Sequence, residues 1–310
     1  MDELDSTLRH FVEEIRLLVE RDPIEGFRRW SALHTELAQL GQFELCDDML
    51  RELKGMDLPG YGLGIVRYAE GWTLDRSGEW EPAIERYQAA LSAFQDAELP
   101  LDVQILTQIG SLYQDQGHYP EAQDAYEQAF ESADEHGRAL LMNNLGGLCA
   151  LRDQPDEARV HFENARTLLE GTDDKCNLAA VLVGLASLAQ DRGELNDAVQ
   201  HLARAIVIFR DLRRPTAMAA AVASLALTYH RAGEYTVAAD TYRTALEYFV
   251  AYKDRANIAR TLANMALTSV AAGKKDEAIG YLQQAVAEYR EIGDAHGEQI
   301  ALDNLRQLGS

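Results

Sequence analysis

Residues 182–205 read LVGLASLAQDRGELNDAVQHLARA, and residues 222–245 read VASLALTYHRAGEYTVAADTYRTA. Both stretches contain an apolar segment, a turn with glycine, and then Ala-x3-[Leu/Tyr]-x2-Ala. The first alanine of this pattern recurs along the chain at intervals of 39, 36, 40, 40 and 40 residues: Ala83, Ala122, Ala158, Ala198, Ala238 and Ala278. Self-similarity at such a period predicts a repeat protein in which each unit stacks on its neighbours.

Each repeat is predicted to be a pair of helices. Apolar residues recur at a spacing of three and four, as at Ile84, Tyr87 and Leu91. We expect the alanines to mark the points where two helices approach most closely, because a larger side chain would not fit there. Five of the turns keep a glycine that can adopt the left-handed conformation and end the preceding helix: Gly78, Gly117, Gly193, Gly233 and Gly273. We find no strand-like alternation, so the chain is predicted to be all-α.

The pattern also predicts how the chain is organised. Two irregular places are expected to bend the stack: a glycine-rich stretch after the divergent first repeat, and the turn in which Asp153 replaces glycine. The predicted segments are an N-terminal capping helix at residues 1–22, a divergent first hairpin at 23–56, a glycine-rich linker at 57–64, six hairpins at 65–290, and a C-terminal capping helix at 291–310.

Composition excludes several classes of partner. The 310 residues include 51 Asp and Glu against 29 Lys and Arg, which gives a formal charge of −22. Such a chain repels phosphate, so we expect neither nucleic acid nor an anionic membrane as a partner. The acidity either solvates the outer face or forms a docking surface for a basic partner. The first residues, 1–5, do not resemble a secretory signal, no apolar run is long enough to span a bilayer, and the three cysteines lack paired spacing. We therefore expect a cytoplasmic protein.

No catalytic or metal-binding motif is found. The eight histidines are scattered, without metal-ligand spacing. Cys46 and Cys149 occupy helix-contact positions and are expected to be buried, whereas Cys176 lies near a loop. The Gly273-Lys274 pair lacks the rest of a phosphate-binding loop, and the glycines of residues 60–64 do not follow a strand. The expectation is a non-enzymatic protein with no cofactor and no metal.

The repeat resembles a known family. Leu106-x2-Ile109-Gly110-x2-Tyr113, followed by the turn at Gly117 and by Ala122-x3-Tyr126-x2-Ala129, is similar to the tetratricopeptide repeat. The resemblance covers about residues 24–308. A period near 40 rather than 34 resembles the long-helix arrays of kinesin light chains, cell-polarity adaptors and bacterial peptide-sensing regulators.

The resemblance implies a right-handed α-solenoid superhelix whose concave face is lined by the first helix of each pair and holds a peptide. The concave positions are Tyr68, Trp72, Gln104, Thr107, Ser111, Asn143, Val183, Ser187, Ala223, Leu227, Arg260 and Leu267. Related long-helix arrays often carry an asparagine that bonds to the ligand backbone. Here Asn144, Asn264 and Asn304 occupy that position with Gln108 as a near match, and the row is interrupted at Ala69, Gly184 and Ser224.

These positions lead to two hypotheses for function. The first is a scaffold or adaptor that binds a partner peptide or helix in the groove, and the second is a regulator whose superhelix changes shape on binding a peptide. Tyr68 and Trp72 are either binding anchors or core residues of their repeat. The positions of a carboxylate clamp hold no basic residue: Ser31, Thr35, Tyr68, Trp72, Thr107 and Ser111. The oligomeric state stays open, with a homodimer through the capping helices as one alternative.

Overall fold

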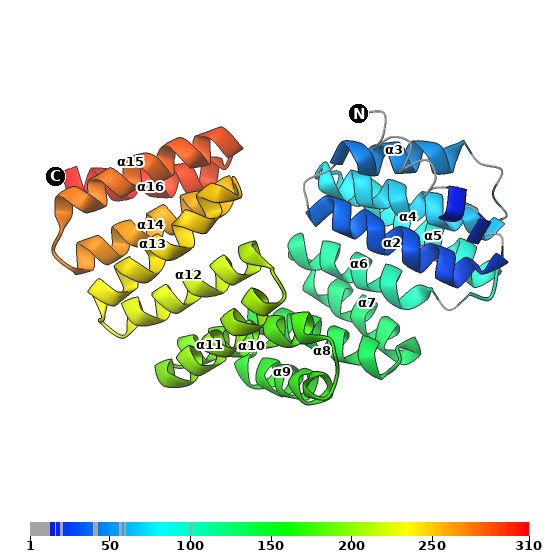
Figure 1. The fold of residues 1–310 in the computed structure, drawn as a ribbon, viewed down its shortest axis with the longest axis horizontal. Helices are drawn as coiled ribbons and strands as arrows, with labels where there is room; N and C mark the ends of the chain where they lie inside the picture. Colours follow the sequence, from blue (N-terminus) through cyan, green and yellow to red (C-terminus); the bar gives the residue numbers. More distant parts are fainter. Residues whose placement is uncertain are drawn as a thin grey trace. The chain divides into compact units, whose positions relative to one another are not determined.

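The computed structural model describes residues 13–15, 17–18, 21–39, 43–55, 58, 60–99 and 101–309. Every regular element within these residues is a helix, which confirms the all-α prediction (Figure 1). The chain divides into two compact units, Met1–Leu148 and Cys149–Ser310. No helix in the described part of the chain is long and apolar enough to cross a bilayer.

The two units carry consecutive sets of helices. The first unit holds α2 (Pro23–Gln39), α3 (Phe43–Lys54), α4 (Gly60–Arg76), α5 (Trp80–Asp96), α6 (Asp102–Asp115), α7 (Tyr119–Ser132) and all but the last residues of α8 (Glu135–Leu151). The second unit holds α9 (Pro155–Glu170), α10 (Lys175–Asp191), α11 (Leu195–Asp211), α12 (Pro215–Arg231), α13 (Tyr235–Ala251), α14 (Arg255–Ala271), α15 (Lys275–Ile292) and α16 (Ala295–Gly309).

Consecutive helices pack as hairpins. In the first unit the packed pairs are α2/α3, α4/α5 and α6/α7, and in the second they are α10/α11, α12/α13 and α14/α15. Each hairpin of the second unit also packs on the next one, through α11 on α12 and α13 on α14 (Figure 1). The helix α9 packs on α10 at one end of this array, and α16 packs on α15 at the other. The second unit is therefore a continuous stack of helical hairpins.

The hairpin turns between α4 and α15 have the predicted left-handed residue. All five turn glycines adopt a φ of 75° to 80°. Asp153, which replaces the glycine in one turn, adopts the same conformation with a φ of 58°. The backbone bonds match too, since Asp153 N donates to Ala150 O at 3.1 Å and Gly193 N donates to Gln190 O at 3.1 Å. The Asp153 turn is thus the same local structure as the glycine turns, because aspartate tolerates this conformation better than most residues.

The alanine pattern lies in the core. All six first alanines of the pattern have no exposed surface. The aromatic or leucine position that follows is also buried in every repeat: Tyr87, Tyr126, Phe162, Leu202, Tyr242 and Leu282. Cys46, which stands in the alanine position of the divergent hairpin, is 1% exposed. These residues fill the space between the helices of each hairpin.

The glycine-rich stretch at 57–64 differs from the expected linker, because α4 already begins at Gly60. A Cβ atom on Gly64 would lie 2.7 Å from Phe94 Cε1, and one on Gly62 would lie 2.5 Å from Leu58 Cβ. Glycine at these positions therefore permits close packing inside a helix. Of the capping helix expected at residues 1–22, only 13–15, 17–18, 21 and 22 are described, and all but residue 22 are helical.

Aspartate caps recur before four helices at multiples of 40 residues and were not predicted. Aspartates stand just before α8, α10, α14 and α16, and each accepts a bond from a backbone N–H in the first turn. They are Asp134, Asp174, Asp254 and Asp294, at distances of 2.7 to 3.1 Å. Such a cap satisfies one of the N–H groups that a helix start leaves without a partner. The signal was present in the sequence as aspartates at intervals of 40, 80 and 40 residues, with Arg214 at the position between Asp174 and Asp254.

Candidate binding surface

In the second unit, the first helices α10, α12 and α14 lie next to one another. In each unit we call the exposed side of its first helices, with α16 included in the second unit, the first-helix surface. Polar side chains join these helices across the repeats. Gln190 Nε2 donates to Thr228 Oγ1 at 2.6 Å and to Ser224 O at 2.9 Å. One repeat further, His230 Nδ1 lies 3.0 Å from Thr268 Oγ1.

The second of these bonds determines how His230 is protonated. Thr268 Oγ1 donates its proton to Asn264 O at 2.8 Å, so it accepts from His230. His230 therefore carries its proton on Nδ1. Burial and the neighbouring Arg231 lower the pKa of His230, which favours the neutral ring. The bond to Thr268 thus holds α12 against α14 with an uncharged group.

The predicted carboxamides of the second unit lie on this surface. Asn264 on α14 and Asn304 on α16 are half-buried. Neither side chain bonds to another residue in the described part of the chain. A carboxamide offers two donors and one acceptor, so both groups are free to bond to a peptide backbone.

In the first unit the corresponding residues behave in the same way. Gln108 on α6 and the pair Asn143 and Asn144 on α8 are half-buried. Within the described residues their side chains also have no hydrogen-bond partner. Each unit therefore presents carboxamides that its own packing does not use.

Arg260 is tied to the start of its own helix. Its Nη2 donates to Asn257 Oδ1, and Asn257 Nδ2 in turn donates to Asp254 Oδ2 at 2.6 Å. Arg260 is exposed and lies four residues, about one helical turn, before Asn264 in α14. It presents a positive charge at the N-terminal end of the first-helix surface on this helix.

Apolar groups accompany the polar ones at the C-terminal end of the second unit. Leu267 and Val270 on α14 are 49% and 44% exposed, and Ile300 on α16 is 50% exposed. The remaining predicted concave positions of this unit, Ala223 and Leu227 among them, are half-buried apart from the exposed Ser187. This part of the surface combines apolar contact area with free carboxamides.

The two predicted aromatic anchors are both engaged within the first unit. Tyr68 is 4% exposed, and its Oη accepts a bond from Gln104 Nε2 at 3.2 Å. The same Gln104 nitrogen donates to Ser31 Oγ at 2.5 Å, so one amide links α2, α4 and α6. These contacts favour the core alternative for Tyr68. Burial raises the pKa of Tyr68 to about 12, so its hydroxyl stays protonated.

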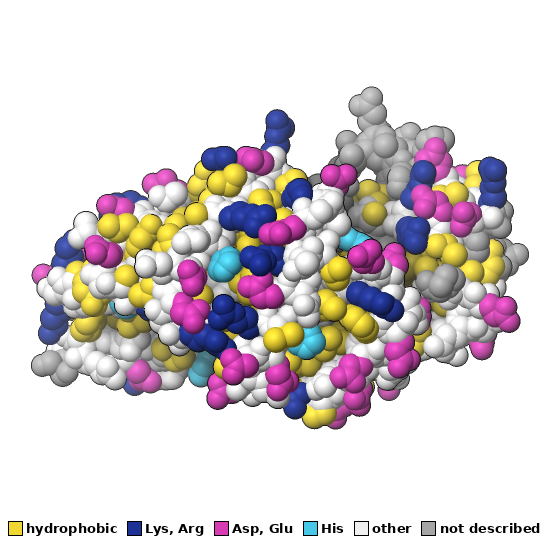
Figure 2. Space-filling model, turned by 90° about the horizontal axis from the view of Figure 1, so that it is seen from below, with side chains coloured by type: hydrophobic (Ala, Val, Ile, Leu, Met, Phe, Trp, Pro, Cys, Tyr) yellow, Lys and Arg dark blue, Asp and Glu magenta, His cyan; other side chains and the backbone are white. Residues whose placement is uncertain are grey.

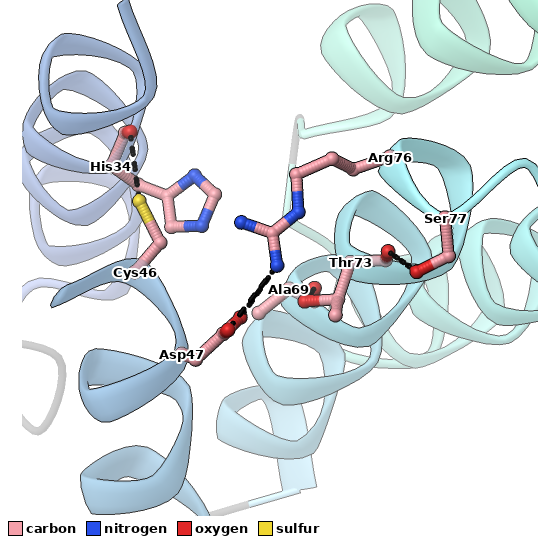
Figure 3. Close-up of polar contacts among 7 residues, drawn as sticks. All are labelled: His34, Cys46, Asp47, Ala69, Thr73, Arg76 and Ser77. Atoms are coloured by element: carbon pink, nitrogen blue, oxygen red, sulfur yellow. Dashed lines mark hydrogen bonds and ion pairs between the residues drawn. The ribbon is translucent and has the colours of Figure 1, made fainter. Parts of the chain in front are cut away.

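Trp72, the other anchor, is half-buried in a cluster that also contains His34 and Arg76. The His34 ring meets the Trp72 ring edge-on at 4.1 Å, and the Arg76 guanidinium lies 5.2 Å from the Trp72 ring centroid. Arg76 also lies over Phe43 at 4.8 Å. It binds both carboxylate oxygens of Asp47, at 3.0 and 3.2 Å (Figure 3). The cluster thus joins α2, α3 and α4.

The titratable groups of this cluster are structural. His34 is 2% exposed, and burial together with the Arg76 charge lowers the pKa of His34 to about 4. Cys46 Sγ donates to His34 O at 3.7 Å, as Figure 3 shows, and burial raises the pKa of the Cys46 thiol. A buried thiol with a raised pKa is a poor nucleophile. Both groups therefore contribute to packing rather than to chemistry.

A pocket of about 140 Å³ lies between α13, α14 and α15. Its lining includes Met265, Thr268, Arg243 and Tyr281. A smaller pocket of about 30 Å³ occupies the equivalent place two hairpins earlier, with His201 in the position of Tyr281. Its recurrence shows that hairpin packing produces the pocket. No group of three or more metal-binding side chains occurs within the described residues.

The charged surface is mixed in sign. Figure 2 shows acidic and basic side chains interspersed with apolar ones over the face that it draws. Many of these charges pair between repeats, as Arg231 does with Asp191 at 3.0 Å and Arg204 with Glu170 at 2.9 Å. Exposed pairs of this kind stabilise a protein by less than about 1 kcal/mol each. On the face drawn, the net charge of −22 is not gathered in one acidic patch.

Comparison with known proteins identifies the repeat. A sequence model described as tetratricopeptide repeat matches residues 73–135, 137–211 and 216–291. No curated protein matches the chain.

Solved structures share the fold at low sequence identity. A chain of the Cut9–Hcn1 hetero-tetramer of the APC/C superposes with a TM-score of 0.70 at 16% identity, over 97% of this chain and 52% of that one. This chain thus spans about half the length of that relative. A Rap protein complexed with competence and sporulation factor gives 0.64 at 13% identity, with 98% of both chains covered. A putative kinesin light chain of Podospora anserina gives 0.52 at 19% identity, over 63% of this chain and 98% of that one.

Proposed function

Because this chain belongs to the tetratricopeptide repeat family, we propose that it is a protein-interaction scaffold whose first-helix surface binds a segment of a partner protein. The proposal rests on the carboxamides that have no hydrogen-bond partner within the described residues. Asn264 and Asn304 are half-buried on α14 and α16 and keep their donors and acceptors available. A peptide backbone offers the complementary groups at every residue, whatever its sequence.

The apolar residues beside the carboxamides supply a second type of contact. Leu267, Val270 and Ile300 expose 44% to 50% of their surfaces. Burying this apolar surface against an apolar side chain of the partner is favourable. Arg260 adds a positive charge on α14. The partner segment is therefore expected to combine apolar side chains with an acidic residue.

Affinity purification tests the proposal. Tagged wild-type protein, Asn264→Ala, Asn304→Ala and Asn144→Ala are used to recover partners from extracts of the source cell, with quantitative mass spectrometry. We expect at least one specific partner of the wild type to be lost or reduced with the variants. Each bond to a partner is expected to contribute about 0.5–1.5 kcal/mol, which corresponds to a loss of affinity of about two- to twelve-fold.

Gln283→Ala is the matched control, because Gln283 is an exposed carboxamide on the second helix α15. This variant is expected to retain every partner. If all three asparagine variants also retain every partner in wild-type amounts, the assignment of the carboxamides is wrong. Turnover of a substrate by the purified protein would replace the scaffold proposal with an enzymatic one.

A peptide-responsive regulator is the second candidate. The bonds between Gln190 and Thr228 and between His230 and Thr268 join successive first helices, so a change in the angle between repeats would have to alter them. A similar fold occurs in the Rap protein that is complexed with competence and sporulation factor. A shift of the scattering profile on addition of the recovered partner would favour the regulator, and an unchanged profile would favour a static scaffold.

A further inference from the structure

Three loops of the second unit have the same backbone structure. They join α11 to α12, α13 to α14 and α15 to α16. Each places one residue in the left-handed region: Arg213 with a φ of 55°, Lys253 with 57° and Gly293 with 74°. In each loop the next residue donates its N–H to a carbonyl five positions earlier, at 2.8 to 2.9 Å. Side chains at equivalent positions therefore project in the same way from all three loops.

Large apolar side chains stand exposed just before the left-handed residue in all three loops. Leu212, Tyr252 and Ile292 follow one another at intervals of 40 residues and are 40%, 56% and 39% exposed. Val250, in the last turn of α13, adds a further apolar group that is 57% exposed. We call Leu212, Tyr252 and Ile292 the loop stripe. Because these exposed apolar groups recur at equivalent loop positions rather than being scattered singly, we interpret them as an interaction site.

The loop stripe is flanked by two cations that the fold does not use. Neither Arg213 nor Lys253 forms an ion pair with any residue in the described part of the chain. Both are exposed. In a chain with a formal charge of −22, two unpaired cations beside exposed apolar groups form a local exception.

The carboxylates near these loops are already bound. Asp211 pairs with Arg210 at 3.1 Å. Asp254 and Asp294 cap α14 and α16 through backbone N–H groups at 3.1 and 2.8 Å. Glu291 lies 3.6 Å from Arg255. Residues 210–215, 250–255 and 290–295 hold six basic and four acidic side chains, which gives these three segments a formal charge of +2.

We propose that the loop stripe, with Arg213 and Lys253, is a second interaction surface that binds an acidic amphipathic helix of a partner protein. The loop stripe places one exposed apolar group per hairpin, and apolar residues seven positions apart recur on one face of an amphipathic helix. Successive apolar residues of such a helix would contact successive residues of the loop stripe, and carboxylates beside them would contact Arg213 and Lys253. This surface lies at the loop ends of the helices and shares no residue with the first-helix surface.

A designed peptide tests the proposal. The probe is a fluorescein-labelled helical peptide of about 22 residues, with leucines seven positions apart and a glutamate beside each leucine. Fluorescence anisotropy measures its affinity for the full chain. We expect the wild type to bind it, with binding weakened by added salt, since the flanking contacts are ionic. Arg213→Glu combined with Lys253→Glu is expected to weaken binding about tenfold or more, as is Leu212→Ser combined with Tyr252→Ser.

A glutamate already occupies a left-handed position of this kind in another loop of the protein. Glu98 adopts the same left-handed conformation, with a φ of 54°, in the loop between α5 and α6. Glutamate therefore fits positions 213 and 253 without a new backbone conformation. Lys274→Glu combined with Lys275→Glu is the matched control, because it changes the net charge equally in the turn at the opposite end of α14. Thermal melts confirm that each variant remains folded.

The outcomes separate the proposal from its alternatives. Retention of wild-type affinity by both loop variants, or equal weakening by the control, overturns it. So does equal binding of a scrambled peptide of the same composition, or no binding by the wild type at about 1 mM. Complete displacement by single-stranded DNA at equal charge would indicate a general polyanion site and would also overturn the helix assignment. The Asn264→Ala and Asn304→Ala variants are expected to bind the probe normally, so this result is independent of the proposed function.

Discussion

Alanine at the hairpin contacts shows how a single small side chain determines the distance between two helices. Ala198 and Ala238 have no exposed surface, and the residues four positions later, Leu202 and Tyr242, are buried beside them. Protein interiors are close-packed, so no space is left for additional atoms. The identity of these residues follows from the geometry of the hairpin.

Ala198→Leu and Ala238→Leu are therefore expected to lower the free energy of unfolding by about 1–3 kcal/mol each, because the added atoms overpack the helix contact. Thermal or denaturant melts measure the change. Ala287→Leu is the control, since Ala287 is exposed on α15 and a leucine there meets solvent. Melts of Ala198→Leu and Ala238→Leu that coincide with the wild type would show that the helices do not meet at these alanines.

His34 predicts a pH dependence of stability. Its pKa is about 4 in the fold, against about 6.5 in an unfolded chain, so the unfolded state binds the proton more tightly. The neutral ring consequently stabilises the fold above pH 6.5, and this contribution, at most about 3 kcal/mol, is lost as the pH falls from 6.5 to 4. The unfolding free energy of His34→Phe is expected to fall less steeply over that window. Parallel curves for wild type and variant would contradict the assignment.

At the scale of the helix, the turns and the caps mark where each helix of the repeat ends and begins. The turn glycines were predictable because left-handed backbone is costly for other residues. The aspartate caps were missed because they lie outside the alanine pattern that defines the repeat. The glycine-rich segment was misjudged for a related reason. Glycine in a sequence indicates either a flexible backbone or the close approach of another group. Only the position of Phe94 against Gly64 shows that close approach is the reason here.

Asp254→Ala removes the cap of α14 and is expected to lower the free energy of unfolding by about 1 kcal/mol. The variant leaves the N–H of Asn257 without its acceptor, and it also removes the partner of the Asn257 side chain. Glu247→Ala serves as the control, because Glu247 is an exposed carboxylate within α13 that caps no helix. Equal melting temperatures for the two variants would show that the cap contributes nothing measurable.

The turns allow a paired test. Gly193→Ala places a side chain at a φ of 75° and is expected to lower the free energy of unfolding by about 1–2 kcal/mol. Asp153→Gly relieves the same conformation in the equivalent turn, so it is expected to be neutral or stabilising. Denaturant melts compare both with the wild type. A greater loss of stability in Asp153→Gly than in Gly193→Ala would contradict the equivalence of the two turns.

For the whole molecule, the period of about 40 residues was sufficient to predict the helical repeat and the family. It was not sufficient to distinguish binding residues from packing residues. Tyr68 and Asn264 occupy positions that the family resemblance places on the same face, yet Tyr68 is 4% exposed and bonded whereas the Asn264 carboxamide is free. The difference arises from contacts with neighbouring helices, such as that of Gln104 with Tyr68, which no single repeat contains.

Site-specific photocrosslinking tests the central claim most directly, because it reports which surface a partner touches. A photoreactive phenylalanine derivative replaces Leu267, which is 49% exposed on α14 in the first-helix surface. The same group replaces Gln283 on the second helix α15, and each protein is irradiated with the recovered partner. We expect a crosslink from position 267 and none from position 283. A partner that crosslinks only from position 283 would contradict binding at the first-helix surface.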